Sequence, residues 1–150
     1  MALVLNQSGI SPKAGDSVYA PYPARAFKLS SSLAAPVGAT TPCKLASADS
    51  TGMPIVTPIT ATSDVVYCVI ATNLRKNSWG ANEVVKGWYA GQVIWLEASA
   101  AITAGAKVSA AVNGTIATAN ATPVLGIAES SASASGELVA VRLVSPYAVQ

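Results

Sequence analysis

The dipeptide Asn113-Gly114 constrains the fold of this chain more than any other feature of its sequence. It lies between residues 107–112 and residues 115–119, two segments that show the alternation typical of strands. Alternation matters because successive side chains of a strand point to opposite faces of a sheet. A two-residue type I′ turn needs positive φ at both central positions, and Asn-Gly is its preferred sequence. We therefore predict a β-hairpin at residues 107–119.

Similar short runs recur along most of the chain. They are rich in β-branched residues, and turn residues separate them at intervals of about 8–12 residues, a pattern typical of sandwiches and barrels. The predicted strands cover residues 65–72, 91–97, 107–112, 115–119, 123–129 and 137–144. We therefore predict an all-β fold, a small antiparallel β-barrel or sandwich, for a core domain at residues 37–150.

The first 36 residues differ, because prolines and glycines interrupt every potential helix or long strand. Tyr19, Tyr22 and Phe27 nevertheless lie among these prolines, and freely disordered tails carry few aromatic residues. We interpret residues 1–36 as an extended N-terminal arm whose aromatic side chains dock on a neighbouring subunit. The alternatives are an irregular loop packed on its own domain, and an arm that folds back so that residues 2–6 add a strand to its own barrel.

Charged residues make up only 11% of the chain, whereas hydrophobic residues make up 51%. Ordinary soluble domains carry about 25% charged residues. No stretch approaches the roughly 20 consecutive apolar residues that span a bilayer, and residues 1–5 lack the basic start of a signal peptide. We therefore expect a soluble chain with no membrane partner that works packed against other proteins.

The residues needed for most catalytic and metal sites are missing. Histidine is absent, which removes the commonest general base and the commonest metal ligand. No pair of carboxylates has a spacing typical of acid–base catalysis, and no glycine-rich phosphate loop opens a helix. Only Arg75 and Lys76 are adjacent cations within a net charge of +2, so the chain lacks a basic stripe for nucleic acid. We expect no enzyme activity, cofactor, metal or nucleic-acid partner.

The two cysteines, Cys43 and Cys68, are too few and too far apart in sequence for a zinc site. A disulfide between them would require an oxidising compartment, and nothing in the sequence indicates export. We therefore predict two reduced, buried thiols.

The three tryptophans are compatible with a sugar-stacking platform, but tryptophan also dominates protein cores and interfaces. Alternation within its strand predicts that Trp95 faces inward. Trp79 follows Arg75 and Lys76 in a polar loop, and this position makes it the stronger candidate for contact with a partner.

Residues 67–79 contain a hydrophobic strand that ends in an Asn-Leu-basic step, followed by a short loop with an aromatic residue. Three further features follow in order: Gly91 before a strand, the turn Ala104-Gly105-Ala106, and a closing hairpin at residues 124–143. Their order and spacing over residues 65–144 resemble the small head cement (decoration) proteins of tailed bacteriophages. This chain has Ala81-Asn82 where that family has a Gly-Asp step.

The resemblance implies a noncatalytic structural protein of the virion that binds the major capsid protein on the outer surface of the capsid. It favours a homo-oligomer, with a trimer preferred to a dimer, and the shortage of charge also indicates subunit burial. The alternative is a carbohydrate- or cell-binding β-domain of a phage fibre or adhesin. The candidate contact residues are Tyr19, Tyr22, Phe27, Arg75, Lys76 and Trp79.

Overall fold

The computed structural model describes residues 12–20, 23–120 and 123–144 of the chain. These residues form eleven strands and no helix, so they include no helix long and apolar enough to cross a membrane. The strands are β1 (Ser17–Tyr19), β2 (Arg25–Leu29), β3 (Pro42–Ala48), β4 (Pro54–Pro58), β5 (Cys68–Ile70), β6 (Val84–Trp88), β7 (Val93–Glu97), β8 (Lys107–Ala110), β9 (Ile116–Thr118), β10 (Gly126–Ala128) and β11 (Leu138–Leu143).

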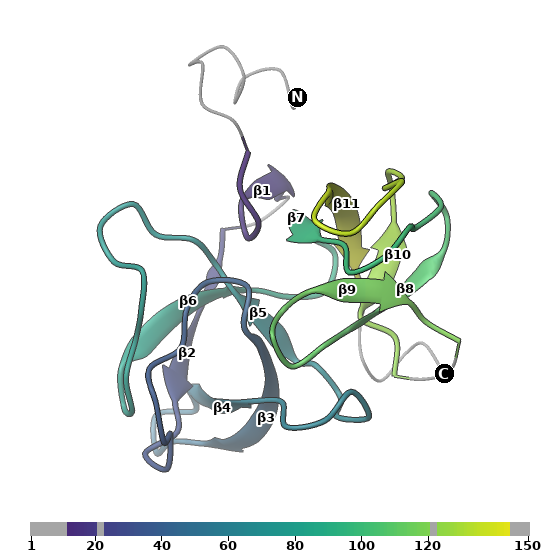
Figure 1. Ribbon diagram of the computed structural model, residues 1–150. Coiled ribbons are helices and arrows are strands. Elements are labelled where there is room, and N and C mark those ends of the chain that lie inside the picture. Colours follow the sequence, from purple (N-terminus) through teal and green to yellow (C-terminus); the bar gives the residue numbers. More distant parts are fainter. Residues whose placement is uncertain (1–11, 21–22, 121–122, 145–150) are drawn as a thin grey trace.

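The strands build two units that lie side by side (Figure 1). Strands β2, β4, β3, β5 and β6 close into a barrel, which we call the barrel. Strands β1, β7, β11, β10, β8 and β9 form a six-stranded sheet in that order, which we call the sheet. All neighbouring pairs are antiparallel except β2 and β4, which are parallel. The all-β fold is confirmed, with a barrel and a sheet together in one chain.

Pairing of β8 with β9 confirms the predicted hairpin, although its turn differs from the predicted type. The Gly114 N–H donates to the carbonyl of Ala111 at 2.9 Å, and the Ala111 N–H donates to Thr115 at 2.8 Å. Gly114 has a φ of +85°, whereas Asn113 does not have a positive φ. The connection is therefore a three-residue loop with glycine at the left-handed bulge position, not a type I′ turn.

Residues 25–29, which we expected in an extended arm, form a strand of the barrel. β2 pairs with β6 on one side and with β4 on the other. Phe27 and Leu29 are completely buried in the barrel, and no proline interrupts the strand. The expectation of an arm over residues 1–36, separate from a core at 37–150, is therefore wrong for this segment, because β2 supplies core side chains.

β1 also belongs to the folded body, because it pairs with β7 at the edge of the sheet. The alternative in which the N-terminal segment packs on its own domain therefore holds for β1 and β2. Residues 1–11, including the strand considered at 2–6, lie outside the described residues.

Each unit has its own hydrophobic core. The barrel core consists of Phe27, Leu29, Cys43, Val56, Cys68, Ile70, Trp79 and Val85. The sheet core is mostly aliphatic and consists of Ile59, Val69, Ile94, Leu96, Ala98, Ile102, Val108, Ala110, Ile116, Leu125, Ala128, Ala132, Val139, Val141 and Leu143. Val69 lies on barrel strand β5 and yet packs in the sheet core, so the two cores meet at that strand.

Polar contacts hold the two units together. The indole N–H of Trp88, at the end of β6, donates to the carbonyl of Gly15 at 2.8 Å. The side chain of Gln92 is completely buried, and its Oε1 accepts the Tyr89 N–H at 2.9 Å. A buried amide is tolerated when it has hydrogen-bond partners. This bond holds the turn between β6 and β7 in place.

Cys43 on β3 stands directly opposite Cys68 on β5. Both thiols are free and buried, as the sequence predicted. The hydrogen bond between the two thiols, together with burial, raises the pKa of Cys68 well above its ordinary value. A buried thiol with a raised pKa stays protonated and behaves as a small core side chain.

Candidate interaction surface

The most prominent exposed element of the barrel is the loop that joins β5 to β6. Residues 73–78 are all exposed, and we call them the projecting loop. Figure 1 shows this connection extending away from the barrel at the upper left. Exposed loops held by a rigid scaffold are common positions for binding residues.

Both ends of the projecting loop are anchored. Thr72 precedes it, and its hydroxyl donates to the Asp16 carboxylate at 2.7 Å. Trp79 follows it, with its side chain buried in the barrel core. The backbone of Trp79 also exchanges two hydrogen bonds with Val37, at 2.8 and 2.9 Å. These anchors limit the entropy that the loop would lose on binding a partner.

The projecting loop presents an apolar side chain beside two cations. Leu74 is fully exposed, and the Asn73 side chain accepts the Arg75 N–H at 2.8 Å in an Asx turn. Lys76 forms an ion pair with Glu83, whose carboxylate also accepts the backbone N–H of Gly80. These two bonds lower the pKa of Glu83, with the Lys76 contact as the larger cause.

The structure separates the six predicted contact residues. Arg75 and Lys76 share the projecting loop, and Tyr19 is 53% exposed on β1 in the sheet. Phe27 and Trp79 are buried in the barrel core, so predicting them as partner contacts was wrong. Both are large side chains that fill the closed barrel. Tyr22 lies outside the described residues.

The outer face of β2 and β6 holds further surface residues that the sequence analysis missed. Lys28 on β2 stands opposite Val84 on β6, and Ala26 stands opposite Lys86. Val84 is 54% exposed, and Lys86 is exposed as well. The alternation of residues 25–29 and 84–88 was the available signal, but it has meaning only once residues 25–29 are recognised as a strand.

The three tryptophans do not share one exposed surface, because Trp79 is buried. Trp79 is in the barrel core, whereas Trp88 packs against the sheet core and bonds to Gly15. Trp95 is only partly buried, because its neighbours Ile94 and Leu96 are the residues of β7 that enter the sheet core. The prediction that Trp95 faces the core was therefore wrong.

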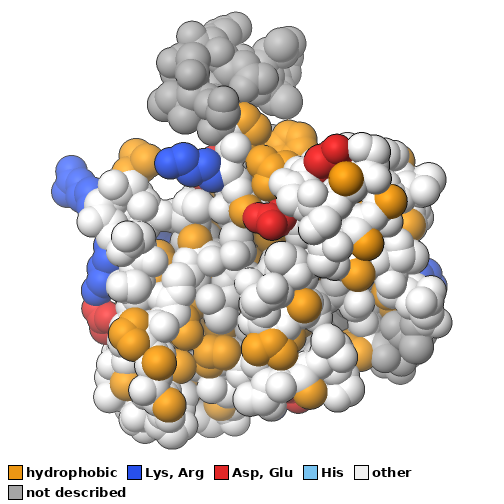
Figure 2. Space-filling model, viewed as in Figure 1, with side chains coloured by type: hydrophobic (Ala, Val, Ile, Leu, Met, Phe, Trp, Pro, Cys, Tyr) orange, Lys and Arg blue, Asp and Glu red, His pale blue; other side chains and the backbone are white. Residues whose placement is uncertain are grey.

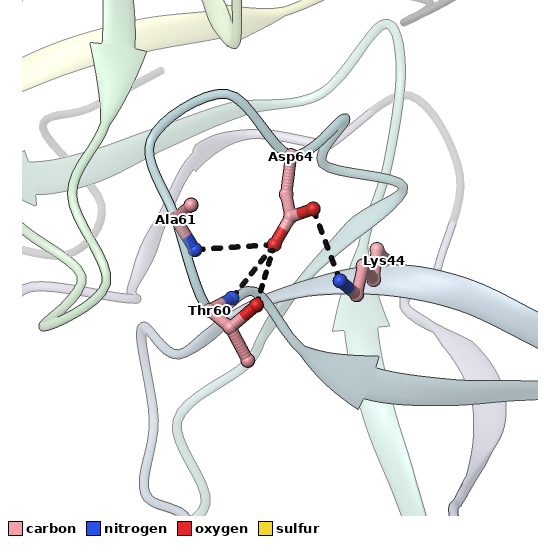
Figure 3. A network of polar contacts seen from close by, with 4 residues as sticks. All are labelled: Lys44, Thr60, Ala61 and Asp64. Carbon is pink, nitrogen blue, oxygen red and sulfur yellow. Dashed lines mark hydrogen bonds and ion pairs between the residues drawn. The ribbon is translucent and has the colours of Figure 1, made fainter.

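The carboxylates hold turns in place. Asp64 is the fullest example (Figure 3): it accepts the backbone N–H groups of Thr60 and Ala61 at 2.7 and 3.1 Å, and its other oxygen lies 3.0 Å from the Lys44 ammonium. These bonds lower the pKa of Asp64 to about 2, and the Thr60 backbone is the largest cause. Asp16, Asp49, Glu83 and Glu137 likewise accept backbone N–H groups in their own loops.

Within the described ranges, no three His, Cys, Asp or Glu side chains are grouped so that they could hold a metal ion.

No protein-family model matches the sequence, and no curated protein matches it either. Among solved structures, the fold is similar to that of the head fiber gp8.5 N base in bacteriophage phi29. The TM-score is 0.51 at 15% sequence identity, and the similarity covers 82% of this chain and 93% of that chain. A likeness at this identity shows a shared fold, and function must be argued from the surface.

Proposed function

We propose that this chain is a noncatalytic structural protein of a phage head, which binds the outer surface of the assembled shell and stabilises contacts between coat subunits. The observation that carries the proposal is the fold, which is similar to that of a phage head fiber base over 93% of the length of that base. The sequence resemblance to head cement proteins, at residues 65–144, points in the same direction.

The composition and the surface support this function. Only 11% of the residues are charged, which suits a chain whose surface is partly covered by other proteins. The proposed partners are the major capsid protein and further copies of this chain, with a trimer favoured over a dimer. A trimer that contacts several coat subunits at once would add avidity to a contact that is weak in a single copy.

The test uses heads from a phage that encodes this chain, prepared with its gene deleted. We expect purified protein to bind these heads at a copy number near that of the coat protein, and to raise their temperature of disruption. Binding at only a few copies per head, or no gain in stability, would contradict the cement function.

The second candidate is a carbohydrate- or cell-binding β-domain of a phage fibre or adhesin. One observation favours a fibre: the similar structure is itself the base of a head fiber. The burial of Trp79 in the barrel core speaks against a sugar-stacking platform made of all three tryptophans. A few copies per head, combined with binding to host cells, would select this candidate.

A further inference from the structure

The charges of the chain are divided unequally between its two units. Residues 23–88, which build the barrel, contain six basic and three acidic residues, a net charge of +3. The described residues of the sheet, 12–20 and 89–144, contain three basic and four acidic residues, a net charge of −1. A chain with few charges therefore has its positive charge concentrated on the barrel.

The cations of the barrel are not equally available. Lys44 and Lys76 form ion pairs with Asp64 and Glu83, and the Arg25 guanidinium lies over the Phe27 ring at 5.7 Å. The other three cations, Lys28, Arg75 and Lys86, form no ion pair within the described part of the chain.

These three cations belong to adjoining elements. Lys28 and Lys86 lie on the paired strands β2 and β6, and Val84 stands opposite Lys28. The projecting loop adjoins this face, because Lys76 is paired with Glu83, the residue immediately before β6. Figure 2 shows Lys and Arg side chains along the left edge of the molecule, where β6 and the loop lie, with an acidic group below them. Further acidic side chains lie over the upper part of the sheet.

We propose that this basic face, formed by Lys28, Leu74, Arg75, Val84 and Lys86, is the surface that docks on the coat protein, at an acidic patch that includes an apolar pocket. The inference rests on the proposed function and specifies its partner surface. Leu74 and Val84 are two of the most exposed large hydrophobic residues of the described chain, and cations without ion pairs flank them. Apolar anchors within a charged rim are the usual anatomy of a protein interface.

The chemistry of the occupant follows from this arrangement. An acidic surface would be attracted by the net charge of the barrel, which would accelerate encounter and make binding depend on salt. The main competing occupant is the acidic sheet of a second copy of this chain. Oligomeric state is therefore measured alongside head binding.

The experiment compares two exposed strand lysines, one from each unit. Lys86→Glu changes the basic face on β6, and Lys107→Glu makes the same change of charge on β8 of the sheet. Arg75→Glu combined with Lys86→Glu enlarges the effect. Binding of each variant to the gene-deleted heads is measured at low and high salt, together with its melting temperature and its sedimentation.

We expect Lys86→Glu to weaken head binding about fivefold and the double variant to weaken it roughly thirtyfold, with a shallower salt dependence. Lys107→Glu should bind within about twofold of the unchanged chain, because surface charges far from an interface have little effect. Leu74→Ser should weaken binding at both salt concentrations, because it removes an apolar contact.

Folded variants of the basic face that bind as well as Lys107→Glu would overturn the proposal. So would a change in sedimentation without a change in head binding, which would assign the face to contacts between copies. Should charge reversal prevent folding, Lys86→Gln and Arg75→Gln apply the same test at half the change in charge. If the unchanged chain does not bind heads, the proposed function itself fails, and this outcome is distinct from failure of the face.

Discussion

The barrel and the sheet are stabilised in different ways. The barrel core has eight buried residues, including Phe27, Trp79 and two cysteines, drawn from five strands and a loop. The sheet core has fifteen buried residues, all of them aliphatic. A core that depends on a few large side chains is more sensitive to the loss of one of them, because the cavity left behind is larger. We expect the barrel to be the more sensitive unit, although it also carries the proposed docking surface.

The strongest test of this comparison is Phe27→Ala. Phe27 is completely buried, and its ring lies over Gly87, where an added Cβ would come within 2.8 Å of ring carbons. Truncation should cost about 3–5 kcal/mol of unfolding free energy, the usual range for a buried phenylalanine. Chemical denaturation measures this loss.

The control for Phe27→Ala is Tyr19→Ala, which changes another aromatic residue of the N-terminal segment. Tyr19 is 53% exposed, so its loss should shift stability by no more than about 0.5 kcal/mol. If the two variants were equally stable, β2 would not belong to the barrel core, and the hypothesis of an extended N-terminal arm would again be favoured.

A second test concerns the place where the sheet meets the barrel. Gly114 has a φ of +85°, and a Cβ there would lie 2.7 Å from the carbonyl oxygen of Thr40 in the barrel unit. Gly136 has a φ of +90° with nothing within 4 Å of an added Cβ. Gly136→Ala should cost about 1–2 kcal/mol for the left-handed conformation. Gly114→Ala should cost about 1–3 kcal/mol more, because the backbone near Thr40 must also move away to make room for the added Cβ.

Thermal melts of both glycine variants measure this difference. Equal melting temperatures would mean that the hairpin does not press on Thr40 and that the two units are less tightly joined than the structure shows.

The smallest expected effect is on acid stability. Asp49, Asp64 and Glu83 of the barrel unit have lowered pKa values, as does Glu137 of the sheet unit. The unfolded chain binds protons at higher pH than the folded chain. The stability that these groups contribute is therefore complete above their ordinary values of 3.8 and 4.5, and is lost as the pH falls toward about 2.

Hydrogen exchange at pH 6 and at pH 3 should show a larger loss of protection in the barrel than in the sheet, because three of these four groups belong to the barrel. Asp64→Asn should reduce the pH dependence, because it removes the carboxyl whose pKa is lowered to about 2. Uniform loss across both units would contradict this division.

The strands of the sheet were easier to predict than those of the barrel, because most of their pairings join segments that are close in sequence. Strands β7 to β11 follow one another with short connections, so alternation and turn residues were sufficient to locate them. β3 and β4 were not among the predicted strands, and Pro42, Pro54 and Pro58 make their sequences less typical of strands. These prolines stand at strand ends, where the missing N–H is tolerated.

The proposed interaction surface could be predicted from the sequence only in part, because burial depends on long-range packing. Arg75 and Lys76 could be recognised from their polar loop. Trp79 follows that loop in sequence, but its side chain is buried in the barrel core, and its backbone pairs with Val37 from the connection between β2 and β3. Lys28 joins the surface only through the pairing of β2 with β6, which no local pattern reveals.

The position of β1 has a consequence for how the chain folds. β1 pairs with β7, although all five barrel strands lie between them in the sequence. Closing so long a loop is entropically costly in an unfolded chain, and contacts of high sequence separation slow folding. A barrel that forms first would shorten this search, because Gln92 beside β7 contacts the Pro23 carbonyl just before β2 at 3.5 Å. We therefore expect β1 to join the edge of the sheet late in folding, after its other five strands have paired.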